Sequence, residues 1–102
     1  MKLTLAWDLK AYKQFEDAIA FIKRDSLVNS EKFEAEILKK LNELLLQPER
    51  YQRDKFKTKN DGSFRAFEIF KYQISYQYSS NQIRIIRLRH TKMTPLNYLN
   101  LF

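Results

Sequence analysis

The chain contains no cysteine, one glycine, two prolines and one histidine among its 102 residues. Without cysteine, a disulfide framework and thiolate chemistry are excluded. The scarcity of glycine and proline argues against a linker, a low-complexity segment or a glycine-rich phosphate loop. No segment approaches the roughly 20 apolar residues of a membrane span, and the start, MKLTLAWDLK, is too short an apolar run for a signal peptide. We therefore expect a soluble, cytoplasmic protein that uses neither a metal nor another cofactor.

The remaining composition is that of a compact globular domain. Apolar residues make up 44% of the chain and aromatic residues 15%, which is enough for a real core. A chain of this length normally folds as one unit and buries roughly two thirds of its unfolded surface. We therefore expect a single domain over residues 1–102.

The positive charge lies entirely in the second half of the sequence. Residues 1–48 carry eight Lys or Arg against eight acids, whereas residues 49–102 carry eleven against four, which accounts for the whole net charge of +7. Such segregation favours binding to a polyanion or to an acidic protein. The alternative is an ordinary soluble protein with a high isoelectric point.

Hydrophobic spacing in the first half predicts one strand followed by two helices. Residues 3–7 alternate as a strand does, and from Leu9 to about Arg24 the apolar residues recur every three or four positions. Ser30, followed by an acid, has the composition of a helix N-cap. A second helix is therefore predicted from there to about Leu46, where Gln47-Pro48 ends it.

The second half predicts a polar connection and a three-stranded meander. Residues 49–63 are polar and include Asn60-Asp61-Gly62-Ser63, a typical turn composition. Period-two alternation then marks strands over 64–70, 72–78 and 83–89. The predicted fold class is α+β with the order β-α-α-β-β-β, in which a helical hairpin packs on one face of a small, mostly antiparallel sheet.

The last predicted strand carries the most distinctive pattern, QIRIIRLRHTKMTP over residues 82–95. Its isoleucines and Leu88 place apolar groups on both faces, as in a strand with neighbours on either side. Arg87, Arg89, His90 and Lys92 then crowd its end. Histidine changes charge near neutral pH, so His90 is the natural acid or base, and the cations could stabilise a phosphorane. A lone histidine at a strand end can instead simply hydrogen-bond the neighbouring backbone.

This order of elements, with Arg89-His90-Thr91-Lys92 closing the meander and Pro95 soon after, resembles the RelE/ParE superfamily of toxins from bacterial toxin-antitoxin modules. The likeness runs from about Leu3 to Tyr98. It implies one of two activities. RelE-like members cleave mRNA on the ribosome without a metal, whereas ParE-like members poison DNA gyrase and are not nucleases. It also implies a small cognate antitoxin as partner.

The resemblance implies roles for particular residues. Arg65 and Lys92 match basic positions of the RelE-type machinery, and Tyr98 matches its tyrosine. Phe67 stands where a second lysine is expected, and Gln73 stands where an arginine is expected, so the set is incomplete. The motif at His90 is closer to ParE-like and plasmid-stabilisation members.

Further basic residues are candidates for contact with the target. Lys55, Lys57 and Lys59 would place three ammonium groups on one side if their segment were extended, and Lys71 and Arg87 would add to that surface. Each of these can also be an ordinary surface charge. We expect a toxin that acts on ribosome-bound mRNA or on gyrase. The alternative is a non-catalytic module that holds an acidic protein. A homodimer through the apolar residues 96–102 is conceivable.

Overall fold

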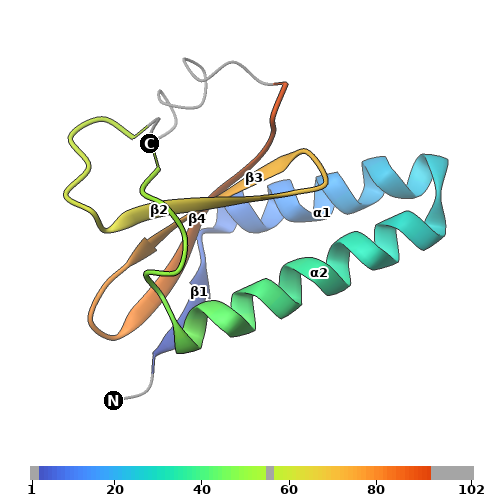
Figure 1. Ribbon diagram of the computed structural model, residues 1–102. Helices are drawn as coiled ribbons and strands as arrows, with labels where there is room; N and C mark the ends of the chain where they lie inside the picture. Colours follow the sequence, from blue (N-terminus) through green and yellow to red (C-terminus); the bar gives the residue numbers. More distant parts are fainter. Residues whose placement is uncertain (1–2, 55–56, 93–102) are drawn as a thin grey trace.

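Two helices pack on one face of a four-stranded mixed sheet (Figure 1). The computed structural model describes residues 3–54 and 57–92. The elements are β1 (Thr4–Trp7), α1 (Leu9–Asp25), α2 (Leu27–Leu46), β2 (Phe64–Ile69), β3 (Tyr72–Tyr78) and β4 (Gln82–His90). This confirms the predicted fold class and order of elements.

Strand β4 lies inside the sheet, whose order is β1-β4-β3-β2. It pairs in parallel with β1 and antiparallel with β3, and β2 pairs antiparallel with β3. The central position predicted for this strand is therefore confirmed. The parallel pair is possible because the helical hairpin carries the chain from the end of β1 back across the sheet.

A β-bulge in β4 decides which of its side chains face the helices. Ser75 pairs with Arg87, but the next residue of β3 pairs with Ile85, so β4 contains one extra residue at Ile86. The phase of the strand shifts there. Ile83, Ile85 and Leu88 consequently share the helix-covered face, whereas a regular strand would have placed them on two faces.

The hairpin between the helices is tighter than predicted. The second helix does not begin after Ser30, which is buried inside α2, but at Leu27. Ser26 caps both helices: its N–H donates to the carbonyl of Ile22 in α1, and its hydroxyl accepts from the N–H of Asn29 in α2. The sequence holds two serines that could cap, and the earlier one is used. Neither helix is long and apolar enough to cross a membrane.

Aromatic rings join the helices to the sheet. Trp7 of β1 stacks on Phe15 of α1 with 5.1 Å between ring centroids. Phe33 of α2 is fully buried and contacts Phe15 and Tyr72, whose centroids lie 6.3 Å and 5.2 Å away. Leu38 of the same helix, by contrast, is 46% exposed. The core thus lies between the middle of the sheet and the side of α2 that carries the buried residues Phe33, Ile37, Leu41 and Leu44.

Strands β2 and β3 are joined by a strained two-residue turn. Ile69 pairs with Tyr72, which leaves only Phe70 and Lys71 as the connection. Their φ angles are +49° and +69°, in the left-handed region that glycine and asparagine favour at such turns. Strand β2 therefore ends one residue before the predicted boundary. The Phe70 ring is 54% exposed, so neither backbone preference nor full burial accounts for it.

We expect Phe33→Ala to lower the free energy of unfolding by about 3–5 kcal/mol, because it opens a cavity where three elements meet. Urea unfolding followed by circular dichroism measures this. The matched control is Phe21→Ala on α1, where the ring is 56% exposed and the expected change is about 0.5 kcal/mol or less. Equal effects of the two substitutions would contradict the described core.

We expect Lys71→Gly to raise the free energy of unfolding by about 1 kcal/mol, because glycine adopts this positive φ without steric cost. The same lysine-to-glycine exchange at Lys39, an exposed helical position, should lower it by a similar amount. Both variants can be compared by urea unfolding. A loss of stability on Lys71→Gly would mean that the turn is not strained.

Candidate functional site

The end of β4 and the β2–β3 turn form a cluster of basic side chains. The N–H of Thr91 donates to the carbonyl of Lys71 at 2.8 Å, which fixes the turn beside the strand end. Arg89, His90 and Lys92 belong to the same end of the sheet. We call Lys71, His90 and Lys92, together with Arg89, the basic end. The structure thus brings together four of the residues singled out from the sequence.

His90 is held by two contacts. It pairs with Tyr72, whose ring it meets edge to face at 5.0 Å between centroids. Its Nδ1 accepts a hydrogen bond from the N–H of Lys92 at 3.1 Å. An accepting Nδ1 places the proton of the neutral ring on Nε2. The backbone contact considered for a lone histidine at a strand end is therefore present, and it fixes the ring beside Lys92.

Arg87 and Arg89 lie on the face of the sheet away from the helices. They pair with Ser75 and Gln73 of β3, on the face opposite to that of the core residues. Both are buried, with 2% and 5% of their surface exposed. Gln73, which stands where the resemblance leads one to expect an arginine, thus lies directly beside Arg89. Because both side chains are buried, their guanidinium groups contribute little to the accessible surface of the sheet.

Arg65 lies on the helix-covered side, because it pairs with Tyr76 of β3, which faces the core. Its guanidinium donates to the carbonyl of Tyr51 at 2.9 Å and lies 3.5 Å from a carboxylate oxygen of Glu49. The hydroxyl of Tyr76 donates to the carbonyl of Pro48 at 2.8 Å. Arg65 and Tyr76 therefore fasten the segment after α2 to the sheet, and Arg65 does not join Arg89.

The loop before β2 is organised by Asn60. Its Nδ2 donates to the carbonyls of Asp54 and Phe64, and its Oδ1 accepts from the N–H groups of Gly62 and Phe64. This role was not predicted, since the sequence marked Asn60 only as a turn residue. An asparagine beside an aspartate and a glycine is the available signal for such a side-chain turn.

The lysines of this loop do not form an extended track. Lys57 and Lys59 lie in a turn, where Lys59 has a φ of +52° and the Lys57 ammonium lies 4.9 Å from the centre of the Phe64 ring. Lys55 and Tyr98 lie outside the described residues. The loop and Arg65 are at one end of β2 and the basic end is at the other, so about 20 Å of strand separates them. Within the described ranges, no cluster of His, Asp and Glu is arranged to hold a metal.

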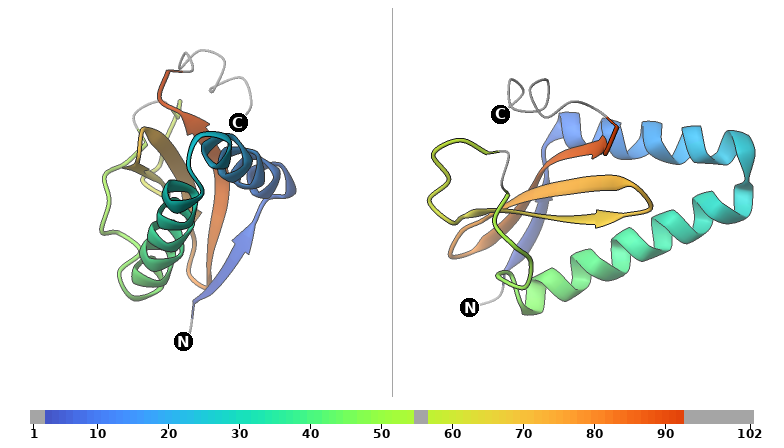
Figure 2. Two further views of the ribbon diagram at one scale, coloured as in Figure 1. Left: turned by 90° about the vertical axis from the view of Figure 1, so that its right-hand side faces the viewer. Right: turned by 45° about the horizontal axis from the view of Figure 1, so that its top comes forward.

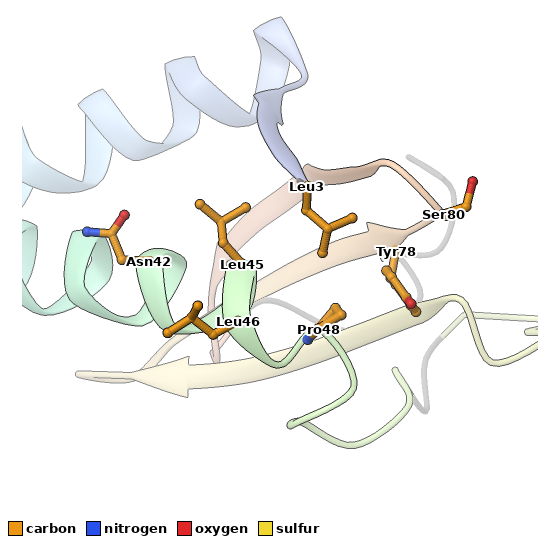
Figure 3. A pocket seen from close by; sticks show the side chains of 7 residues that line it. All are labelled: Leu3, Asn42, Leu45, Leu46, Pro48, Tyr78 and Ser80. Carbon is orange, nitrogen blue, oxygen red and sulfur yellow. The ribbon is translucent and has the colours of Figure 1, made fainter. Parts of the chain in front are cut away.

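A separate apolar hollow lies at the C-terminal end of α2. It has a volume of about 630 Å³. Figure 3 shows Leu45 and Leu46 on one side and Tyr78 with Ser80 on the other, and Leu3, Asn42 and Pro48 complete the lining. Among the described residues, no charged side chain lines this hollow. It therefore offers surface for an apolar group and no evident chemistry.

We expect Tyr76→Phe to change the alkaline stability of the protein. Burial raises the pKa of Tyr76 to about 12, against 10 for an unperturbed tyrosine, although nearby Arg65 opposes the shift. The raised pKa of Tyr76 means that the folded state holds the phenolic proton more tightly than the unfolded state. The resulting stabilisation is complete below pH 10 and is lost as the pH rises from 10 towards 12. In Tyr76→Phe the free energy of unfolding should fall less steeply over this range.

At pH 7 the same variant should be about 1 kcal/mol less stable, because the carbonyl of Pro48 loses its hydrogen bond. Urea unfolding at a series of pH values tests both effects. Tyr12→Phe, which alters a 44% exposed ring on α1, is the control and should follow the wild-type profile. A Tyr76→Phe profile parallel to that of the wild type would refute the assignment.

The fold of this chain is similar to that of a solved toxin structure. A solved structure of Escherichia coli toxin RelE, in the form of a double arginine-to-alanine variant in its free state, matches 97% of this chain and 94% of its own with a TM-score of 0.58. At 16% sequence identity this likeness concerns the fold alone. No curated protein sequence matches significantly. The family model of the ParE toxin of the parDE type II toxin-antitoxin system matches residues 5–95, and the chain therefore belongs to that toxin family.

Proposed function

We propose that this toxin arrests growth in the cytoplasm by poisoning DNA gyrase, as ParE-like toxins do, and that it does not cut RNA. Membership of the toxin family implies a cognate antitoxin, which would keep the toxin inactive. The gyrase target is our inference from the arrangement of the candidate residues.

The observation that carries this proposal is the separation of the candidate catalytic groups. Metal-independent RNA cleavage needs a proton acceptor, a proton donor and a cation within a few ångströms of one phosphate. Arg65 lies on the helix-covered face with its guanidinium engaged by the Glu49–Tyr51 segment, whereas Arg89 lies on the opposite face. Gln73 supplies no cation beside Arg89. The described residues thus favour binding over cleavage.

The basic end is suited to such binding. Lys71 and Lys92 are exposed, and His90 is half-buried beside them. Ammonium groups on a rigid strand end and a fixed turn attract an acidic protein surface or DNA phosphates without reorganising. We infer that this cluster contacts the gyrase-DNA complex.

RNA cleavage on the ribosome remains a second candidate because of one contact. The backbone N–H of Lys92 donates a hydrogen bond to Nδ1 of His90 and fixes the orientation of this imidazole, a group that acid-base catalysis can use. An oriented imidazole alone does not replace the cation expected at Gln73. We therefore rank cleavage below gyrase poisoning.

The test is to induce the chain alone in bacterial cells and to incubate the purified protein with gyrase, ATP and supercoiled plasmid. We expect growth arrest with a DNA-damage response, and accumulation of linear plasmid. Lys71→Glu/Lys92→Glu should reduce the linear product at least roughly tenfold, since it reverses two exposed charges of the basic end.

Lys10→Glu/Lys13→Glu is the matched control, because it makes the same change in net charge on the exposed side of α1. It should retain the activity. Arrest with mRNA cut at ribosomal sites and intact DNA would overturn the gyrase assignment in favour of cleavage. Absence of arrest would instead favour the non-catalytic binding module.

A further inference from the structure

The two margins of the sheet differ in how far the chain itself covers them. On the outer side of β2, the N–H of Asp54 donates to the carbonyl of Phe64, and the N–H of Ala66 donates to the carbonyl of Gln52. Strand β1 forms the other margin (Figure 2), and β4 is its only neighbour among the described strands. We call the outer side of residues 3–7 the β1 edge.

The β1 edge carries backbone groups that have no strand partner. The N–H groups of Thr4 and Asp8 point inward and donate to carbonyls on the β4 side. In a parallel pair, alternate residues face the neighbouring strand. Leu3, Leu5 and Trp7 therefore direct their N–H and C=O groups outward, where no described strand pairs with them. Such a row of groups is a template for another strand.

The sequence of this margin does not protect it against pairing. Exposed edges of soluble proteins commonly carry lysine, proline or a bulge, which prevents a second strand from adding to the sheet. Strand β1, with the sequence TLAW, has neither a charged residue nor a proline. The β1 edge is therefore suited to extension of the sheet by one more strand.

An exposed leucine lies near each end of the β1 edge. Leu9 follows β1 at the start of α1 and is 86% exposed, and Leu46 at the end of α2 is 84% exposed. They are the two most exposed large apolar side chains of the described residues. Leu46 lines the apolar hollow at the end of α2 together with Leu3, at the start of the β1 edge (Figure 3). A projecting leucine thus lies beyond one end of the edge, and an apolar hollow lies at the other.

A twofold axis at Leu5 brings these features together. In an antiparallel pair of β1 strands with Leu5 opposite its own copy, Leu3 of each strand lies opposite Trp7 of the other. The outward N–H and C=O groups of all three residues then form hydrogen-bonded pairs. The same rotation carries Leu9 of each copy past Leu3 of the other, towards the end at which Leu46 lines the hollow. The margin is therefore complementary to itself.

The distribution of charge also favours a second copy as the occupant. Two chains of net charge +7 repel each other in most orientations, but the whole surplus lies in residues 49–102. The β1 edge belongs to the neutral half of the sequence. Arg84 of the adjacent β4 is paired with Asp8, with 3.4 Å between nitrogen and oxygen. Two copies can therefore approach here with little repulsion, whereas an acidic protein would find no cation among residues 3–7.

We propose that this protein forms a twofold-symmetric homodimer through the β1 edge, which joins the two four-stranded sheets into one. The residues 96–102, considered above for a homodimer, lie outside the described residues. Strand β4 runs parallel to β1 and continues beyond Trp7 to the basic end. The basic ends of the two copies therefore lie at opposite ends of the joined sheet, outside the interface. A dimer of this kind offers two contact surfaces to a target and gains in avidity.

The test measures the mass of the full-length chain alone by analytical ultracentrifugation over a wide range of protein concentration. We expect an equilibrium between a monomer and a species of twice the 12.4 kDa of one chain. Thr4→Lys/Ala6→Lys should weaken the dimer at least roughly 30-fold, because the register places position 4 opposite position 6 of the other copy and sets like charges against each other.

Ala20→Lys/Val28→Lys is the matched control, because it adds the same charge at two exposed positions near the junction of the helices. It should dimerise within about threefold of the wild type.

A mixing experiment separates loss of the interface from loss of the fold. Thr4→Glu/Ala6→Glu should also be monomeric on its own, because it sets acids against each other. An equimolar mixture with Thr4→Lys/Ala6→Lys should form a heterodimer, since each lysine then lies opposite a glutamate. Recovery in the mixture requires that both variants are folded and that positions 4 and 6 face each other.

The leucine contact is tested by single substitutions. Leu9→Ser should weaken the dimer roughly tenfold, because its apolar side chain no longer reaches the hollow of the other copy. Leu27→Ser, at a 54% exposed position on α2 near the junction of the helices, should leave the dimer unchanged.

Three results would overturn the proposal: a monomer at every concentration, equal weakening by the two lysine pairs, or no heterodimer in the mixture. A monomer would leave the β1 edge to a strand of a different protein. These measurements use neither gyrase nor cells, so their outcome is independent of the function proposed above.

Discussion

The single extra residue in β4 determines how this protein distributes its charges. Before the bulge, arginine alternates with isoleucine, and Ile83 and Ile85 face the helices. Had the strand continued regularly, Arg87 and Arg89 would have followed them into the apolar layer under the helices, where a guanidinium group without polar partners carries a large free-energy penalty. The bulge moves Leu88 into that layer and turns the arginines to the other face. The helix-sheet core and the position of the basic residues therefore have one common cause.

The same shift explains why the basic residues do not form one continuous surface. His90 returns to the helix-covered side, where it meets Tyr72, while Arg89 remains on the other face. Arg65, at the far end of β2, faces the core side and is held by the segment after α2. The β2–β3 turn lies beside the two helices, whereas the loop before β2 lies towards the opposite end of the sheet (Figure 2).

Much of the fold could be predicted from the sequence because its signals are periodic. Spacings of three and four identified the helices, alternation identified the strands, and the isoleucines at 83, 85 and 86 identified a central strand. The bulge could not be read in this way, since adjacent isoleucines also describe a strand that is apolar on both faces. The helix start was missed because Ser26 and Ser30 satisfy the same capping rule, and the choice between them depends on how the hairpin packs.

The candidate site was only partly predictable. Proximity in sequence grouped Arg89, His90 and Lys92 at one strand end, and hydrogen bonds connect His90 with both other residues, although the side chains of Arg89 and His90 lie on opposite faces. It could not show that Lys71 joins them, because that depends on the pairing of β3 with β4. It also could not show that Arg65 lies on another face, because a one-residue offset in register reverses the direction of a side chain. The role of Asn60 depends on backbone groups that only the closed loop brings together.

Ser26 caps both helices and is the single residue between them. A connection of one residue cannot absorb an insertion, and each added residue would turn α2 about 100° around its axis relative to α1. Such a rotation would exchange the buried side of α2 for the side that carries Lys32 and Lys39. The length of this joint is therefore as constrained as the composition of the core, and the two helices are expected to open and close as one cooperative unit.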